Sequence, residues 1–469
     1  MTDLTLCDLF ELSDLIDAGK ASPLEITQAF LGRIEAENHL YNAYVNLTAD
    51  AALAAAAKAT EALSNGPRKG PLDGLPIGHK DLYSTAGVTT TGGSRVLADN
   101  VPVEDATVVA RLTDAGMITL GKLNTHEFAY GPTGEASCFG TTHNPWDTDR
   151  ITGGSSSGSG AVVAAGLTPV ATGSDTGGSI RMPAACCGVT GLKATYGRVP
   201  RTGILPLCWT MDHSGPLSRT ARDAALVLQA TAGADGRDAA TPDVPVPDYL
   251  AGIGDGIAGM RIGIPRAYFF DEAQAQVTDV VEDALRELER LGATIVDVEL
   301  DHIRMAGMAA FPIYAAEATA YHDDTLDDRA DLFTEQVRVF LELGDQVLAK
   351  DYLHAQRYRT LLGNSMAAVL ADVDLMATPG IAITATPIGD LEVDINGTAD
   401  SVFNALLRNT APFDLTGLPA IVVPCGFAAD GLPVSLQLAG RAFDEATVLR
   451  AAHAYQQATD WHTRRPPRP

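Results

Sequence analysis

The N-terminal region carries apolar positions at the spacing of amphipathic helices. Between Leu6 and Ile16, large apolar residues recur at near-helical spacing, which predicts a first helix. Ser22 then precedes a proline, and Glu25 follows three positions after the serine, a capping box that opens a second helix. The second helix has apolar residues at positions 26, 30 and 34 on one face. A third, alanine-rich helix is expected over residues 51–63.

From Gly74 onward, short apolar stretches separated by Gly, Pro, Ser and Thr replace the helical pattern. Strand and helix patterns then alternate towards the end of the chain, which is typical of an α/β fold with a central sheet. The expected helices cover residues 107–115, 277–288 and 446–456, and the expected strands cover residues 117–120, 294–300, 421–423 and 434–438.

No internal repeat interrupts this alternation, so we expect one large domain made of four sequential regions. Residues 1–65 form an N-terminal helical segment of that domain, and residues 66–220 form the core that holds the chemical motifs. Residues 221–375 are more helical and are expected to cover the substrate. Residues 376–469 supply the strands and the helix that complete the core.

The charge balance changes which partners are expected. The chain has 33 basic and 59 acidic residues, a net charge of −26, and this argues against a nucleic-acid or anionic-membrane surface. No apolar run reaches the roughly 18 residues of a membrane span, and the N-terminus lacks a secretory pattern. Six scattered cysteines without metal-ligand spacing indicate a reducing compartment. We therefore expect a cytoplasmic protein with no metal and no cofactor.

The most informative stretch is rich in glycine and serine and spans residues 153–191. A flexible linker is excluded because residues 161–165 and 168–171 are apolar and predict a helix and a buried strand. A phosphate-binding loop is disfavoured because no Gly-Lys-Ser/Thr follows the glycines. One alternative is that Ser156, in a GxSxG pattern, is the nucleophile of an α/β-hydrolase, but the preceding residues 144–150 are polar and turn-like.

Three separated motifs resemble those of the amidase signature family. They are GLPIGHKD around Lys80, GGSSSGSG around Ser155, and GSDTGGSIRMPAACCGVTG around Ser179. Their order and the 24-residue separation of the two serines fit the family, and similarity extends over nearly the whole chain. The resemblance implies a large mixed central β-sheet covered by α-helices on both faces.

The resemblance also implies a Ser-Ser-Lys triad. Ser179 would be the nucleophile, Lys80 the base, and Ser155, which follows a cis peptide bond in this family, would carry the proton between them. This agrees with elementary chemistry, because a serine hydroxyl needs an adjacent base. A lysine is such a base only where burial lowers its pKa, and the apolar residues 75–77 before Lys80 are consistent with burial.

Glycines just before the nucleophile let successive N–H groups point at one spot, as an oxyanion hole requires. We expect Asp175 and Arg181 to pair as scaffold on either side of this loop. The family places its oxyanion hole on the residues that match Thr176, Gly177, Gly178 and Ser179.

The substrate pocket is less strongly indicated. A helix-like stretch is expected over residues 124–128, and the residues after it match the region that lines the acyl pocket in family members. The candidate substrate-binding residues are Tyr130, Gly131, Ser156, Trp209 and Met211, with Leu207, Phe311 and Tyr314 as further apolar walls.

These motifs predict an amidohydrolase that cleaves amide, anilide or carbamate bonds, and also esters, through an acyl-enzyme. The alternative is the glutaminase subunit of a tRNA-dependent amidotransferase. That subunit uses an acidic residue just before the segment matching residues 410–412, and residues 403–409 here contain none. A non-catalytic relative is disfavoured because all three triad residues are present. We expect a small-molecule amide substrate, no nucleic-acid or membrane partner, and a monomer or homodimer.

Overall fold

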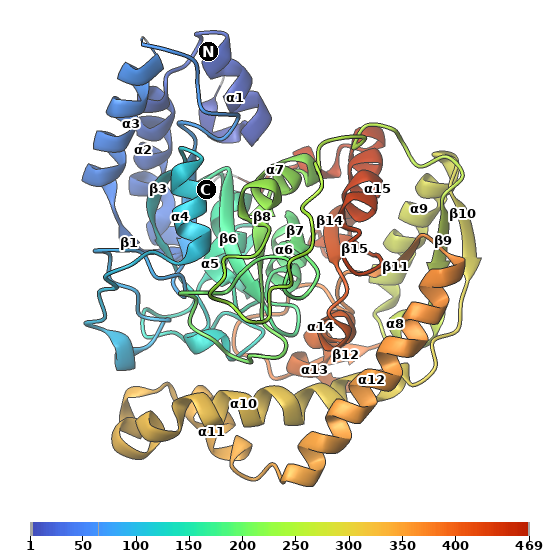
Figure 1. Ribbon diagram of the computed structural model, residues 1–469. Coiled ribbons are helices and arrows are strands. Elements are labelled where there is room, and N and C mark those ends of the chain that lie inside the picture. The colour runs from blue at the N-terminus through green and yellow to red at the C-terminus, as the bar shows by residue number, and fades with distance from the viewer. Residues whose placement is uncertain (1–2, 64, 468–469) are drawn as a thin grey trace.

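The computed structural model describes residues 3–63 and 65–467, and its centre is an eleven-stranded mixed β-sheet. The strand order is β1-β3-β2-β6-β8-β7-β14-β15-β11-β9-β10. The strands are β1 (Tyr44–Leu47), β2 (Pro76–Lys80), β3 (Ile118–Leu123), β6 (Val170–Asp175), β7 (Thr190–Lys193), β8 (His213–Ser218), β9 (Arg261–Ile264), β10 (Thr294–Asp297), β11 (Leu375–Pro379), β14 (Ala420–Phe427) and β15 (Pro433–Ala439). Helices cover both faces, as expected (Figure 1).

The N-terminal helices form as the sequence predicts. They are α1 (Leu9–Asp17), α2 (Pro23–Tyr41) and α3 (Ala49–Leu63), and they lie beside β1 and β3 at one end of the sheet (Figure 1). Both hydrogen bonds of the predicted capping box are present, because Ser22 and Glu25 each accept from the other's backbone N–H. The apolar face of α2 at positions 26, 30 and 34 is buried.

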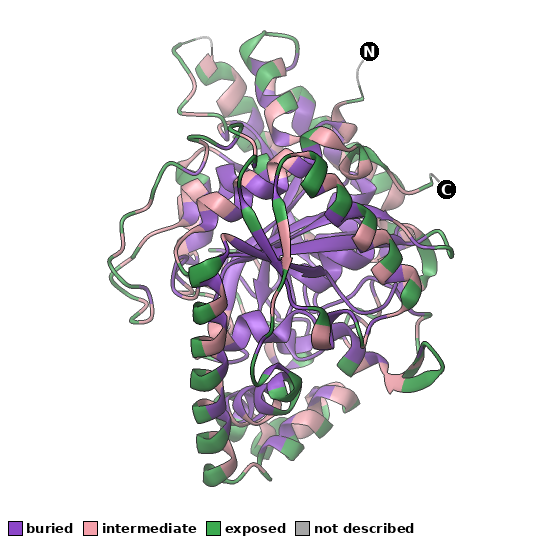
Figure 2. Cartoon of the chain, turned by 90° about the vertical axis from the view of Figure 1, so that its right-hand side faces the viewer, coloured by how far each residue is buried: buried purple, intermediate pink, exposed green. Residues whose placement is uncertain are grey.

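The middle of the sheet is buried on both faces. Every residue of β2, β6 and β11 is buried, which is typical of strands covered by helices on each side. Figure 2 shows buried strands at the centre of the molecule. The helices packed on the sheet include α5 (Ser157–Ala165), α6 (Arg181–Cys187), α7 (Ala221–Thr231), α9 (Ala275–Arg290) and α15 (Glu445–Ala458), and α4 (Thr107–Asp114) packs on α7.

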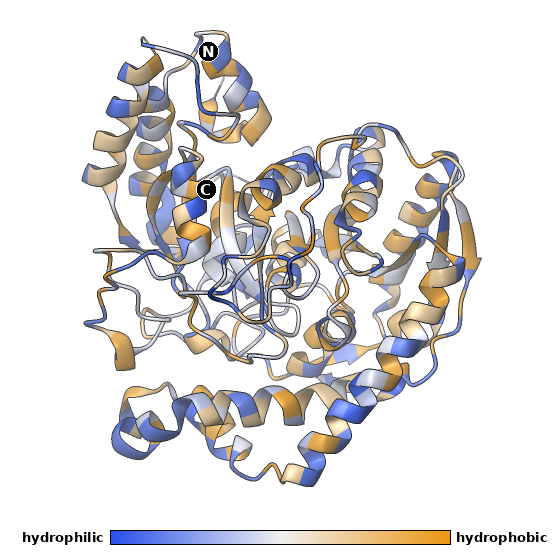
Figure 3. Cartoon of the chain, in the orientation of Figure 1, coloured by the Kyte–Doolittle hydropathy of each residue, from blue (hydrophilic) through white to orange (hydrophobic). Residues whose placement is uncertain are grey.

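A layer of long helices lies along one edge of the molecule. These are α10 (Ala306–Arg329) and α11 (Glu335–Gly344), along the lower side of Figure 1, and α12 (Ala349–Asp372), which rises from there towards the right-hand side. Hydrophilic and hydrophobic residues alternate along α12 (Figure 3), as in a helix with one packed face. Helices α10 and α12 both contact α14 (Ala411–Thr416), which follows α13 (Val402–Leu407), and a short α8 (Arg266–Phe269) precedes α9.

Two small hairpins lie outside the main sheet. They consist of β4 (His143–Asn144) with β5 (Asp147–Ile151), and of β12 (Glu392–Ile395) with β13 (Thr398–Ser401). Strand β5 precedes the GxSxG pattern, but residues 147–149 are exposed and the strand is not part of the main sheet, since it pairs with β4 and bridges to Pro387 through Arg150. A nucleophile elbow follows a buried strand of the central sheet, so this hairpin argues against the α/β-hydrolase alternative for Ser156.

The helix expected over residues 124–128 is not formed. The chain makes only a 3-10 turn, Glu127–Ala129, and Phe128 and Ala129 have left-handed backbone angles, with φ of 49° and 61°. The backbone N–H groups of Glu127 and Phe128 donate to the carbonyls of Ala136 and Gly92 instead of to a preceding helical turn. Neighbouring loops therefore satisfy this backbone in place of a helix.

None of the helices in the described part of the chain has the length and apolar character needed to cross a bilayer.

Candidate active site

Lys80 is the last residue of β2 and is fully buried in the middle of the sheet. Its Nζ donates to Ser155 Oγ at 2.7 Å and to Ser174 Oγ at 2.9 Å. Ser174 lies on the neighbouring strand β6, and Thr172, two residues earlier on the same face, accepts from the Lys80 backbone N–H at 3.1 Å. Strand pairing therefore brings the lysine and these hydroxyls together.

Burial lowers the pKa of Lys80 to about 7, although the nearby carboxylates Asp175 and Asp212 act in the opposite direction. A lysine with this pKa is largely neutral at mildly alkaline pH. Its amine can then accept a proton from a hydroxyl, which an ordinary surface lysine cannot do at that pH.

Ser155 lies between β5 and α5, and the peptide bond that joins it to Gly154 is cis. Its carbonyl accepts from the His126 backbone N–H and from Thr125 Oγ1, both at 3.0 Å. These two contacts hold the residue so that its hydroxyl faces Lys80.

Ser179 lies in the loop between β6 and α6, beside the loop that carries Ser155 and Ser156. Its carbonyl accepts from the Ser156 backbone N–H at 3.2 Å, which ties the two serine-rich loops together. The Ser179 residue is buried but lines a narrow cavity. Within the described residues its hydroxyl makes no hydrogen bond, and none joins it to Ser155.

The loop before Ser179 presents unpaired backbone donors. From Thr176 to Ser179, no backbone N–H donates to another described residue. Gly178 has a φ of +131°, and a Cβ there would lie 2.1 Å from Thr410 Oγ1. Thr410 Oγ1 also donates to the Gly177 carbonyl at 2.6 Å. This loop therefore needs glycine for its conformation and leaves its N–H groups available to an oxyanion.

The Asp212 carboxylate holds the same loop in place through hydrogen bonds. Its carboxylate accepts from Thr176 Oγ1 at 2.6 Å and from the backbone N–H groups of Leu207 and Cys208 at 2.9 and 3.0 Å. Burial raises the pKa of Asp212 to about 6, even though these hydrogen bonds act to lower it. The carboxylate thus connects the glycine loop to the segment that carries Leu207.

Arg181 and Asp175 pair beneath the loop, as the sequence predicts, and a second carboxylate joins them. Arg181 Nη2 lies 2.9 Å from Asp175 Oδ1 and 2.6 Å from Asp414 Oδ2, and all three side chains are fully buried. Asp175 Oδ2 also accepts from the backbone N–H of Ile180 at 3.1 Å. Burial alone would raise the pKa of Asp175, but Arg181 holds it below its ordinary value. This cluster positions the start of α6 directly after the loop that carries Ser179.

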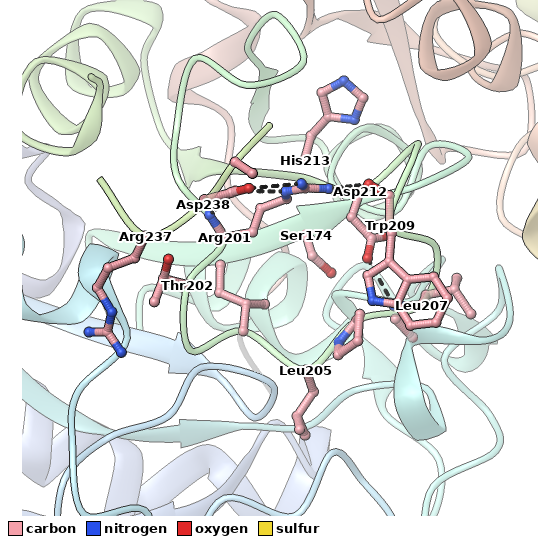
Figure 4. Close-up of a pocket in the computed structure, with 14 residues that line it drawn as sticks. Ser174, Arg201, Thr202, Leu205, Leu207, Trp209, Asp212, His213, Arg237 and Asp238 are labelled. Atoms are coloured by element: carbon pink, nitrogen blue, oxygen red, sulfur yellow. Dashed lines mark hydrogen bonds and ion pairs between the residues drawn. The ribbon is translucent and has the colours of Figure 1, made fainter. Parts of the chain in front are cut away.

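Three cavities meet around Ser179. A neck of about 30 Å³ contains Ser179, and a cavity of about 820 Å³ shares Tyr314, Phe403 and Leu407 with it. A third cavity of about 340 Å³ shares Ala129 and Leu207 with the neck. Figure 4 shows this third cavity, in which Arg201 and Asp238 point toward one another.

The predicted substrate residues fall in different places. Tyr130 and Gly131 line the neck, and Trp209, which is 46% exposed, lines the third cavity. The Tyr130 hydroxyl is buried and has no hydrogen-bond partner among the described residues. Ser156 is buried, and its hydroxyl bonds the backbone of Ser174. Met211 is fully buried and lines none of the three cavities.

Sequence reasoning missed Ser174, Asp212 and Thr410. The alternation of β6 was a usable signal for Ser174, because it lies on the same strand face as Thr172. Asp212 and Thr410 reach the loop from distant segments, so no local pattern could have indicated them.

The comparisons with known proteins define the class. A model of the amidase family matches residues 25–449. A glutamyl-tRNA(Gln) amidotransferase subunit from Chloroflexus aggregans is 44% identical over 489 residues, and the alignment covers 99% of each chain. An amidase of Pseudomonas putida is 42% identical, again with 99% of each chain covered. The chain therefore belongs to the amidase signature family of hydrolases.

A solved structure gives the same result. An inhibitor-bound vestigial protein complex, described as revealing the origins of an s-triazine catabolic enzyme, superposes with a TM-score of 0.92 at 34% identity. The match covers 96% of this chain and 98% of that chain.

These relatives correct the prediction about partners. The sequence led us to expect a small-molecule amide substrate, no nucleic-acid or membrane partner, and a monomer or homodimer. That prediction is wrong, because the Chloroflexus relative is named as one subunit of an amidotransferase and the similar structure is a protein complex. The motifs behind the prediction lie in the buried core and carry no information about surfaces that contact other protein chains.

Proposed function

We propose that this protein hydrolyses carbon–nitrogen amide bonds through an acyl-enzyme formed on Ser179. The observation that carries the proposal is the buried Lys80 amine, which lies 2.7 Å from the Ser155 hydroxyl beside the Ser179 loop. Ser179 is the nucleophile, Ser155 relays the proton, and neutral Lys80 is the base. A base with a pKa of about 7 is suited to this task near neutral pH.

The reaction has two stages, acylation of Ser179 and hydrolysis of the acyl-enzyme. Lys80 takes a proton from Ser155, which takes the proton of Ser179, and Ser179 Oγ attacks the amide carbon. The N–H groups of residues 176–179 stabilise the oxyanion. The proton then returns to the leaving nitrogen, the C–N bond breaks, and the acyl group stays on Ser179. Water, activated by the same relay, attacks the ester and releases the acid.

The neck around Ser179 favours an uncharged group beside the reacting carbonyl. No charged side chain lines the neck among the described residues. Leu407, which lies in the stretch just before Thr410, is apolar. A carboxylate or ammonium group buried there would lack a partner to offset its desolvation. We therefore propose that the substrate is a neutral amide, with anilides and carbamates as related substrates.

The names of the relatives favour a second candidate function. The amidotransferase subunit from Chloroflexus aggregans is 44% identical to this chain, and the alignment covers 99% of both sequences. On that basis the same chemistry would release ammonia from glutamine for a tRNA-dependent amidotransferase. The two candidates share the triad and differ in the substrate.

Ammonia release by the purified full-length chain separates the two. With propionamide and glutamine compared at equal concentrations, we expect a higher kcat/KM for propionamide because of the uncharged neck. A preference for glutamine would establish the second candidate. Ser179→Ala is the control for both, and persistent release in that variant would contradict the proposed chemistry altogether.

A further inference from the structure

The neck at Ser179 admits only a slim group. Its volume of about 30 Å³ corresponds to roughly one water molecule. Met182, Leu407 and Phe403 are among its walls, and even a Cβ added at Gly177 would lie 2.7 Å from Leu407 Cδ2. This narrow neck therefore disfavours a ring or a branch attached directly to the reacting carbonyl and favours a methylene chain.

The cavity beyond the neck has the size and lining of a site for an aromatic ring. It has a volume of about 820 Å³, within the usual range for small-molecule pockets. Phe340 and Phe403 meet there edge to face, with ring centroids 5.4 Å apart, and Phe311 and Tyr314 do so at 5.6 Å. Aromatic walls of this kind bind an additional ring through apolar contact and edge-to-face geometry.

The charged groups of this cavity are already paired. Arg304 contacts Glu272 at 2.6 Å, and Arg408 contacts both Glu272 and Asp400. An ion in the cavity would have to compete with these pairs, so the free surface favours an uncharged ring.

The position of the base decides which end of the substrate enters this cavity. Ser174, which accepts a hydrogen bond from Lys80, lines the third cavity on the other side of the neck. The leaving nitrogen must receive its proton from the Lys80 relay, so it belongs on that side. The third cavity contains polar groups, including Asp212 and Thr202, beside apolar residues such as Ile204, and these polar groups can receive a small amine. The acyl arm is left to occupy the aromatic cavity.

We infer that the substrate class is an amide of an aryl-alkanoic acid, with a methylene linker in the neck and the ring in the aromatic cavity. This inference rests on the proposed amide hydrolysis at Ser179 and adds the identity of the acyl arm. The leaving group is ammonia or a small amine.

A set of amides tests the inference. We expect kcat/KM for 3-phenylpropionamide to exceed that for propionamide about ten- to a hundred-fold, the range expected for burying one phenyl ring. Benzamide, whose ring is attached to the carbonyl, should fall below propionamide. N-Benzylacetamide is an isomer of 3-phenylpropionamide with the ring on the amine, and it should gain less than about threefold over acetamide, since its ring would enter the third cavity and not the aromatic cavity.

A variant that fills the cavity gives an independent readout. Gly307 lines the aromatic cavity on α10, and a Cβ there meets open space. Gly307→Trp should lower the ratio of kcat/KM for 3-phenylpropionamide to that for propionamide by about tenfold or more, because the indole occupies the space of the ring. Gly363→Trp is the matched control, since Gly363 is also a helical glycine with open space but lies on α12 outside the cavity. The control should keep the ratio of the parent protein.

Different results would overturn the acyl-arm inference and the proposed function. If propionamide is hydrolysed but the phenyl group gives no gain, or Gly307→Trp leaves the ratio unchanged, the acyl-arm inference is overturned and the proposed function stands. A larger gain for N-benzylacetamide would reverse the orientation and also overturn it. If no amide is hydrolysed and a serine-directed phosphonate does not label Ser179, the proposed function fails, and the inference fails with it.

Discussion

Lys80 is a residue whose chemistry depends on where the sheet places it. An amine at the end of β2, between two hydroxyls and out of water, has a pKa of about 7 instead of its ordinary value above 10. The free energy needed to bury the amine is supplied by the surrounding sheet, and the result is an amine that loses its proton near neutral pH.

The pH dependence of turnover follows from this pKa. The amine must be neutral to accept a proton, so kcat/KM should rise with pH through about 7 and reach a plateau above about 8. Steady-state rates on propionamide between about pH 5.5 and about pH 9.5 measure this profile. Lys80→Met should lower the rate by roughly 10²–10⁴-fold while the circular dichroism spectrum stays the same. A flat profile, or near-normal turnover in the variant, would contradict the role of Lys80.

Arg181 is a structural counterpart to Lys80. Its guanidinium lies between two buried carboxylates, Asp175 and Asp414, so its loss removes the ion pairs that it makes with both. Arg181→Met should lower the free energy of unfolding by about 3–5 kcal/mol, measured by urea denaturation. Arg338→Met removes an exposed ion pair with Glu342 and should leave the midpoint nearly unchanged. Equal effects of the two variants would refute the structural role of Arg181.

At the scale of elements, the loop between β6 and α6 carries the site. Gly178 combines a φ of +131° with a contact that leaves no room for a side chain beside Thr410. Gly178→Ala should reorient the N–H groups and lower kcat by about 10²-fold or more. Gly236→Ala is the control, because Gly236 also has a positive φ of +71° but faces open space, and its kcat should be unchanged. A fully active Gly178→Ala variant would show that these N–H groups are not used.

Elements with a local signal could be predicted from the sequence, and elements held by distant contacts could not. The capping box at Ser22 encodes its own hydrogen bonds and was found. Residues 124–128 have a helical pattern but form no helix, because distant loops accept their N–H groups. The serine and lysine motifs could be recognised, whereas the contact of Asp212 with Thr176 depends on the pairing of β6 with β8. Strand order and such cross-strand contacts cannot be predicted from any short segment of the sequence.

At the scale of the whole molecule, the sheet joins the four regions expected from the sequence. Strands from residue 44 to residue 439 pair in one continuous sheet, with β9 and β10 of the helical region at its far edge. Unfolding one region would expose the edge of the next, so we expect a single cooperative transition. Urea unfolding of single-tryptophan variants that keep only Trp146 or only Trp461 should give coincident midpoints. Midpoints that differ by more than about 0.5 M would show that the regions unfold independently.

The identity of the acylated serine tests the central claim most directly. The full-length protein is treated with a serine-directed phosphonate that carries no charge, digested, and analysed by tandem mass spectrometry. The account predicts one modified residue, Ser179, with labelling that slows as the pH falls below about 7 because Lys80 becomes protonated. Lys80→Met should suppress the labelling. A phosphonate on Ser156 would contradict the account and restore the nucleophile-elbow alternative.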